Sequence, residues 1–217
     1  MESNLNVVPL TPMVQRCAAG FCSGNDYLDN FLKSTIALNP AYGKTYVWLT
    51  EDNKRIIGYY SLGTGYLERV LKDEKSRVKL GGSIHINGFA LDKKYHGVYQ
   101  GVTEDGEKIN LSDILLGECI ERIYRIRENI IGFSFITLGS SMEGYSLYKR
   151  NAFETLEDDM SFSVEEAEKD YILMYLPLDY EEGQSQILCK LQMRHEQSRI
   201  IHCARQRIYP TAALCAV

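Results

Sequence analysis

The fold is decided by residues 84–91, Ile84-His-Ile-Asn-Gly-Phe-Ala-Leu91, and by the apolar series that begins at Leu111. The first segment is rich in β-branched and aromatic residues and predicts a strand. The apolar series has helical spacing and predicts an amphipathic helix; its members are Leu111, Leu115, Cys119, Ile123, Ile126 and Ile130. Residues 92–110 between them are polar. Because a helix N-terminus presents unpaired N–H groups and a positive dipole end, this strand-loop-helix unit is a natural anion-binding site.

Outward from this unit, short elements alternate in type along the chain. Ser23 is a plausible N-cap for a helix that Asn39-Pro40 ends, and Asn110 with Asp113 resembles a capping pair. The other expected elements are an edge strand at 5–14, paired strands at 45–50 and 55–62, a polar connection at 68–83, a strand at 133–138, a helix at 142–151 and a strand at 171–178. This order predicts an α/β sandwich built around one twisted sheet.

Composition excludes several classes of protein. The chain has 217 residues, of which 45% are hydrophobic and 24% charged, as in an ordinary globular protein. No window approaches the ~18 apolar residues of a membrane span. The N-terminus lacks the basic start and apolar run of a signal peptide, so we expect a cytoplasmic protein with reduced cysteines. The six cysteines include no Cys-x-x-Cys, and we therefore expect no metal site.

Charge is distributed unevenly along the chain. Five Lys or Arg and one Glu give residues 184–217 a charge of +4, which leaves −9 on residues 1–183 out of a total of −5. We therefore expect one acidic domain over 1–183 and a basic tail over 184–217, which could dock as a helix, act as an arm or be poorly ordered. An acidic body favours a cationic substrate such as an amine and attracts nucleic acid less.

Two local features could carry chemistry. Gly97, Gly101 and Gly106 lie in the polar loop, but they match neither the P-loop nor the Gly-x-Gly-x-x-Gly pattern, so turn glycines are the commoner explanation. Tyr148 follows a predicted central strand and could donate a proton to a leaving group. With 15 tyrosines in the chain, an ordinary core or surface tyrosine is the competing interpretation.

Four segments together resemble the GCN5-related N-acetyltransferases. They are Cys22-Ser-Gly-Asn-Asp-Tyr-Leu-Asp-Asn-Phe-Leu32, Ile57-Gly-Tyr-Tyr-Ser-Leu62, Phe89-Ala-Leu-Asp-Lys-Lys-Tyr-His-Gly97 and Tyr145-Ser-Leu-Tyr-Lys-Arg-Asn-Ala-Phe153. The resemblance covers about residues 5–179 and is greatest to the branch that contains acetyltransferase toxins of toxin–antitoxin pairs. It implies a mixed, mostly antiparallel sheet flanked by helices, and transfer of acetyl from acetyl-CoA to an amine.

The resemblance also implies roles for individual residues. The pantetheine arm would lie between the strand ending at Leu91 and the strand 133–138, bonded to main-chain groups of Phe89, Ala90 and Leu91. The family's pyrophosphate loop corresponds to His96-Gly-Val-Tyr-Gln-Gly101, in which His96, Gly97 and Gly101 match the pattern while Tyr99 replaces a glycine. Residues 98–109 resemble an insertion, after which the amides of Leu111, Ser112 and Asp113 would face the pyrophosphate, although the Asp113 carboxylate competes with a phosphate there.

In the same resemblance, Tyr148 matches the tyrosine that protonates the departing thiolate, and Asn151 could reach the cofactor. Glu143 is the candidate general base, with a solvated carboxylate as the competing interpretation. Three functions stay open: an N-acetyltransferase acting in a ternary complex on a small-molecule or macromolecular amine, a toxin acetylating aminoacyl-tRNA, and a non-catalytic relative with a degenerate CoA site. A clustered basic face would favour tRNA; its members would be Lys33, Lys44, Arg69, Lys72, Lys75, Arg77 and Lys79. A homodimer is also open.

Overall fold

The computed structural model describes residues 5–71, 76–102, 106, 108–162 and 171–178. The predicted tail 184–217 and the domain boundary at 183 lie outside the described residues. The helices are α1 (Pro12–Gln15), α2 (Asp26–Lys33), α3 (Leu111–Asn129) and α4 (Tyr145–Arg150). The strands are β1 (Val7–Pro9), β2 (Lys44–Leu49), β3 (Ile56–Val70), β4 (Arg77–Leu91), β5 (Tyr99–Val102), β6 (Lys108–Asn110), β7 (Phe135–Ser140), β8 (Glu154–Thr155), β9 (Met160–Ser161) and β10 (Ile172–Pro177).

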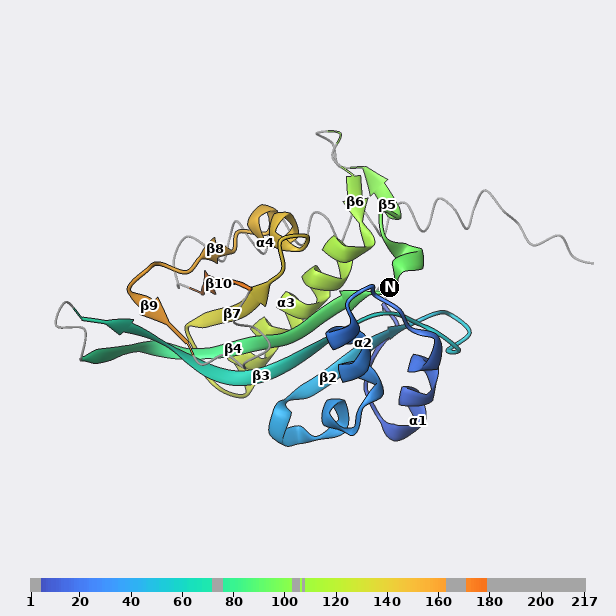
Figure 1. The fold of residues 1–217 in the computed structure, drawn as a ribbon, viewed down its shortest axis with the longest axis horizontal. Coiled ribbons are helices and arrows are strands. Elements are labelled where there is room, and N and C mark those ends of the chain that lie inside the picture. Colours follow the sequence, from blue (N-terminus) through green and yellow to red (C-terminus); the bar gives the residue numbers. More distant parts are fainter. Residues whose placement is uncertain (1–4, 72–75, 103–105, 107, 163–170, 179–217) are drawn as a thin grey trace, which may run out of the picture.

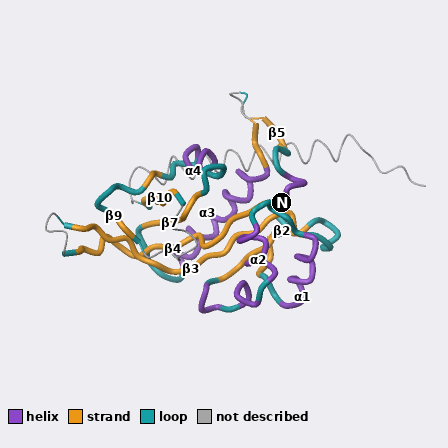
Figure 2. Tube along the Cα trace, in the orientation of Figure 1, coloured by secondary structure: helices purple, strands orange, loops and turns teal. Residues whose placement is uncertain are grey.

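One twisted sheet organises the molecule, with its strands in the order β1-β2-β3-β4-β7-β10-β8 and with β9 paired to β3. Every described neighbouring pair is antiparallel except β4 and β7, which run parallel. Figure 1 shows α1 and α2 on one side of the sheet and α3 and α4 on the other. Figure 2 shows the same layers by secondary structure. The predicted mixed, mostly antiparallel sheet flanked by helices is confirmed.

Each face of the sheet is covered by its own apolar core. On one face the buried side of α3, with Leu115, Leu116, Ile120 and Ile123 among it, packs on the sheet together with residues of α4. On the other face Leu32 of α2 packs with residues of β2 and β3. Burying both faces is what commits this sheet to a sandwich, because an uncovered apolar face would remain in water. No helix in the described part of the chain is long and apolar enough to cross a bilayer.

Residues 68–83 are not the polar connection that the sequence indicated. Instead β3 runs on to Val70 and β4 starts at Arg77, and the two form a hairpin arm that extends beyond the main sheet (Figure 1). At the base of the arm β9 pairs with Glu68 and Arg69, and Leu67 and Leu80 pack there with Phe162. Farther out, charged residues such as Arg77 and Lys79 are exposed. An ion pair between Arg77 and Glu68 links the two strands across the arm.

Smaller differences concern where the elements begin and end. The predicted strand 5–14 stops at Pro9, and Thr11 caps α1 by accepting from the Val14 N–H at 3.3 Å. Asn25 rather than Ser23 caps α2, because the Ser23 hydroxyl donates to the Asp29 carboxylate at 2.6 Å. The predicted loop 92–110 contains a second small sheet, the β5–β6 hairpin. This hairpin projects from the body, as expected of an insertion (Figure 1).

Candidate active site

The candidate site lies where two central strands separate. β4 and β7 pair only from Ser83 with Phe135 to Ile86 with Leu138. On its other side β4 pairs with β3, and the register of this pairing shifts at the same place. Ile86 and Gly88 have partner residues on β3, whereas Asn87 between them has none and forms a β-bulge. A bulge bends a strand and ends regular pairing. Residues 87–91 therefore leave β7 and open a gap in the middle of the sheet.

Main-chain groups of Phe89 and Leu91 face this gap. The Asp92 N–H donates to the Ile57 carbonyl of β3 at 2.9 Å. Along an antiparallel strand the main-chain N–H and C=O groups of every second residue point to the same neighbour, so those of Ala90 also face β3. The prediction that Ala90 would bond a pantetheine arm is thereby corrected, since its groups are already paired. The Leu91 carbonyl lies 3.1 Å from the Nε2 atom of His96, which places His96 at the end of the gap.

Tyr148 is held beside the gap from the α3 side of the sheet. Its side chain is 6% exposed, and its ring makes edge contacts with Phe89 and Phe153, with centroids 6.2 and 5.7 Å away. Burial raises the pKa of the Tyr148 phenol, with a smaller contribution from Cys119. In the part of the chain that the structure describes, no hydrogen bond to the hydroxyl is found. The phenol therefore stays protonated and can act as an acid toward a group in the gap.

The turn after α4 fixes Tyr148 in place. Ala152 has a φ of 67°, in the left-handed region, and this turns the chain back so that the Phe153 N–H donates to the Tyr148 carbonyl at 3.1 Å. Glu143, the predicted base, is exposed in the turn before α4 and does not line the cavity described below. Its position favours the competing interpretation, a solvated carboxylate.

Part of the loop predicted to bind pyrophosphate makes hydrogen bonds within the protein instead. The Leu111 N–H donates to the Val98 carbonyl at 3.1 Å, which closes the stem of the β5–β6 hairpin. The expected free amide of Leu111 is therefore not available. Gly101 lies within β5, opposite Ile109, and not in a turn before α3. Gly97 is exposed with a φ of 70°, and Ser112 lies in the first turn of α3. Contact of these two residues with the pyrophosphate stays a prediction.

Asp113 and Asn151 belong to an internal network. Arg150 donates to the two Asp113 oxygens at 2.7 and 3.1 Å, and Asn151 Nδ2 lies 3.3 Å from the carboxylate. The Asn110 N–H donates to it as well, at 3.2 Å. Burial opposes ionisation of Asp113, but the bonds and charge of Arg150 outweigh it and hold the pKa of the carboxyl below its ordinary value. Both side chains therefore support the junction of α3 and α4, while contact of the Asp113 amide and of Asn151 with the cofactor stays a prediction.

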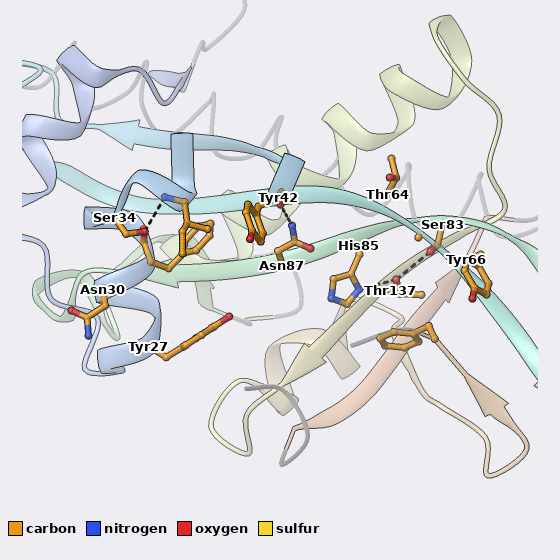
Figure 3. Close-up of a pocket in the computed structure, with 14 residues that line it drawn as sticks. Tyr27, Asn30, Ser34, Tyr42, Thr64, Tyr66, Ser83, His85, Asn87 and Thr137 are labelled. Carbon is orange, nitrogen blue, oxygen red and sulfur yellow. Dashed lines mark hydrogen bonds between the residues drawn. The ribbon is translucent and has the colours of Figure 1, made fainter. Parts of the chain in front are cut away.

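A cavity of about 520 Å³ opens on the opposite, α2 face of the sheet, beside the point where β4 and β7 separate. Figure 3 shows its lining drawn from α2, β3, β4 and β7. The lining consists of Tyr27, Asn30, Phe31, Ser34, Ile36, Tyr42, Thr64, Gly65, Tyr66, Ser83, His85, Asn87, Thr137 and Phe162. None of the residues predicted from the sequence as site residues is in this set. The sequence contained one signal of this cavity, since His85 and Asn87 are polar residues within the otherwise apolar predicted strand 84–91.

The floor of the cavity is a chain of three buried polar side chains. The Nδ1 atom of His85 lies 3.0 Å from Thr137 Oγ1, and the Thr137 hydroxyl lies 3.4 Å from Ser83 Oγ. When Thr137 donates to Ser83, Nδ1 must donate to Thr137, and the lone pair of the imidazole is then on Nε2. Phe162 packs on the imidazole, with ring centroids 5.3 Å apart. Among the described residues, no three or more His, Cys, Asp or Glu lie close enough to hold a metal ion.

No protein-family model matches the sequence. The structure is similar to a crystal structure of a bacterial toxin, with a TM-score of 0.58 and 17% identity over 86% of this chain and 95% of that chain. It is similar to a tyrosine-to-phenylalanine mutant of KacT, with a TM-score of 0.58 and 16% identity over 79% and 93% of the two chains. AtaTR bound with acetyl-CoA matches with a TM-score of 0.51 and 14% identity over 79% and 93%. With the splayed β4 and β7 strands, these likenesses give the chain the fold of the GCN5-related N-acetyltransferases.

Proposed function

We propose that the protein transfers the acetyl group of acetyl-CoA to an amine. The observation that carries this proposal is the gap between β4 and β7, with a protonated Tyr148 on one side and an open cavity on the other. A thioester in the gap would be reached by an amine from the cavity. A new C–N bond forms at the acetyl carbon, the C–S bond breaks, the amine loses one proton and the thiolate gains one.

The two proton transfers need two groups on opposite faces. Tyr148 is proposed to protonate the departing thiolate, since its buried phenol is neutral and adjoins Phe89. His85 is proposed to accept the proton of the amine, because it lines the cavity and Thr137 orients it through Nδ1. Imidazole is the side chain most often used for this task. Glu143 is exposed and outside the cavity, so it is the weaker candidate.

Binding of acetyl-CoA is proposed to use the gap and the loop beyond it. Phe89 and Leu91 would bond the pantetheine arm as a strand would, because their main-chain groups face the missing neighbour. Gly97 and the Ser112 amide at the start of α3 would meet the pyrophosphate, where the helix dipole favours an anion. His96, beside Leu91, would border the same path.

Among acceptors, the amino group of an aminoacyl-tRNA is the better supported class. Two structures that are similar in fold, the bacterial toxin and an AtaT mutant, are described as toxins, and the sequence resembles the toxin branch of this superfamily. In the predicted basic face the charges of two members are offset, because Arg69 pairs with Glu157 and Asp159 and Arg77 pairs with Glu68. Lys72 and Lys75 lie outside the described residues. Contact with tRNA would therefore depend more on the other described members of this face, the exposed Lys33, Lys44 and Lys79.

Titration with acetyl-CoA tests the proposal against a non-catalytic role. We expect saturable binding in calorimetry, and N-acetylated product by mass spectrometry when acetyl-CoA and a mixture of aminoacyl-tRNAs are supplied. Binding without product would leave a CoA-binding protein with another acceptor. Absence of binding at millimolar acetyl-CoA would mean a binding free energy of less than about 4 kcal/mol in magnitude. That result would instead favour a non-catalytic relative with a degenerate CoA site.

A further inference from the structure

Among the residues that the structure describes, the lining of the cavity on the α2 face contains no carboxylate, ammonium or guanidinium. Resting on the function proposed above, we propose that it selects an acceptor whose amine is attached to an uncharged aromatic or large apolar side chain. The acceptor class thus differs from the cationic amine that the acidic body suggested, because the lining of a cavity acts on the substrate at contact distance while net charge acts weakly through solvent.

The aromatic content of the rim is the first argument. Tyr42 and Tyr66 line the cavity although 49% and 43% of each residue is exposed, and the rings of Phe31 and Phe162 also line it. Exposed aromatic rings gathered at a hollow mark a binding site more than they serve the fold. A flat or bulky apolar side chain would cover these rings and remove their surface from water.

The second argument concerns charge at the rim. Aromatic rings alone could also attract a cation, but the ammonium of Lys79 already lies 5.4 Å from the centroid of the Tyr66 ring. A second positive charge on the acceptor would meet this lysine and would find no carboxylate among the described lining residues. Arginine or lysine side chains on an aminoacyl acceptor should therefore be rejected.

Asn87 supplies the polar contact that would orient the amine. Its Nδ2 atom donates to the Tyr42 carbonyl at 2.6 Å, which only the NH₂ end of the amide can do, so Oδ1 points the other way (Figure 3). Gly43 makes room for this bond, since a Cβ there would lie 2.9 Å from Nδ2. The Oδ1 atom and His85 are on the same strand at the cavity, so both can meet an amine that enters toward the gap.

Amino-acid methyl esters of phenylalanine, arginine and glycine test the proposal, because each has the α-amine and ester of an aminoacyl group. Arginine matches phenylalanine roughly in size but adds a charge. We expect kcat/KM for the phenylalanine ester to exceed that for the arginine ester by at least about tenfold, and calorimetry without acetyl-CoA to show the same order of binding. The glycine ester should fall below the phenylalanine ester, because it leaves the rings uncovered.

Two matched pairs of variants localise the effect. Tyr42→Ala should lower the phenylalanine-to-arginine ratio about fivefold, whereas Tyr99→Ala, at an exposed tyrosine outside the cavity, should not. Thr64→Glu adds a carboxylate at an exposed lining position and should raise turnover of the arginine ester about fivefold, as expected of an exposed ion pair. Thr155→Glu, on β8 and outside the lining, is its control.

The binding measurement separates this proposal from the proposed activity. If acetyl-CoA binds and no ester is acetylated, a preference for the phenylalanine ester in calorimetry still supports the acceptor class. Equal or tighter binding of the arginine ester would overturn it, as would ratios that Tyr42→Ala and Thr64→Glu leave unchanged. Failure of the protein to bind acetyl-CoA would count against the acetyltransferase function alone.

Discussion

At Tyr148 the proposed chemistry depends on one hydroxyl held in an apolar environment. The rings of Phe89 and Phe153 enclose the phenol, and burial keeps it protonated over the neutral pH range. The same enclosure means that a residue of identical shape should preserve the packing. The hydroxyl can therefore be removed with little effect on the fold, which makes Tyr148 a clean test of the acid.

Tyr148→Phe should lower kcat by about 10²–10⁴-fold and leave the Kd of acetyl-CoA nearly unchanged, because only the proton donor is lost. Steady-state kinetics with an accepted amine and calorimetry with acetyl-CoA give the two values. Unaltered turnover would show that solvent or another group protonates the thiolate. Tyr145→Phe, one helical turn before Tyr148, is the matched control.

His85→Gln and Glu143→Gln compare the two candidate proton acceptors. We expect His85→Gln to lower kcat by about 10²-fold or more, since the amide cannot take the proton. Glu143→Gln should change kcat by less than about twofold, because this exposed carboxylate lies outside the cavity. Kinetics with saturating acetyl-CoA measure both effects. A larger loss in the Glu143 variant would restore the original assignment of the base.

Among the elements, the start of α3 carries most of the internal bonding next to the site. Asp113 joins Asn110 at the helix start to Arg150 at the end of α4. The lowered pKa of Asp113 means that this carboxylate stabilises the fold above its unfolded pKa of about 4, and that the stabilisation is lost as pH falls through the folded value. The network therefore predicts a sensitivity to acid at this junction.

Asp113→Asn should lower the free energy of unfolding by about 1–3 kcal/mol at pH 7, because hydrogen bonds to a buried charged group are lost. The difference from the unmodified protein should shrink as the pH falls below about 4, because the unfolded chain takes up the proton there and folded Asp113 follows at its lower pKa. Urea titrations across this pH range measure it. A difference that is constant with pH would contradict the role of the charge, and Asp158→Asn, at an exposed carboxylate, serves as the control.

The β5–β6 hairpin should be dispensable for cofactor binding. Replacing residues 100–108 by a short Gly-Ser linker keeps the buried Ile109 and the bond from Leu111 to Val98. Calorimetry should then give a Kd for acetyl-CoA within about tenfold of the original, equivalent to ~1.4 kcal/mol. A greater loss would place phosphate contacts in the hairpin, with Gly101 among the residues to test first.

For the molecule as a whole, the described residues already close both cores around the sheet. Truncation after Gly183 should therefore change the melting temperature by less than about 5 °C, which is roughly 1–2 kcal/mol for a domain of this size. Calorimetric melting of the full chain and the truncated chain at several concentrations tests this. A larger and concentration-dependent drop would show that the tail completes an oligomer, since the stability of an oligomer depends on protomer concentration.

The sequence by itself determined the order of the central elements. Residues 84–91 lie in β4, and the series from Leu111 to Ile126 lies in α3, because their patterns are local and each pattern matches the period of one element. Ile130, the last member of the series, follows the helix and is 78% exposed. The position of Tyr148 after a central strand could be predicted for the same reason. The arm of β3 and β4 could not, because it depends on pairing with β9 and on the packing of Leu67 and Leu80 with Phe162, which are contacts between segments distant in the chain.

Only the tertiary structure decided which groups meet at the site. The bulge at Asn87 depends on pairing with β3, and the cavity unites residues of α2, β3, β4 and β7 that are distant in the chain. The Leu111 amide, which the sequence pattern predicts to be free, donates a hydrogen bond to the Val98 carbonyl at the base of the hairpin. Such long-range contacts leave no periodic trace, because they depend on how elements pack and not on the residues of any one element.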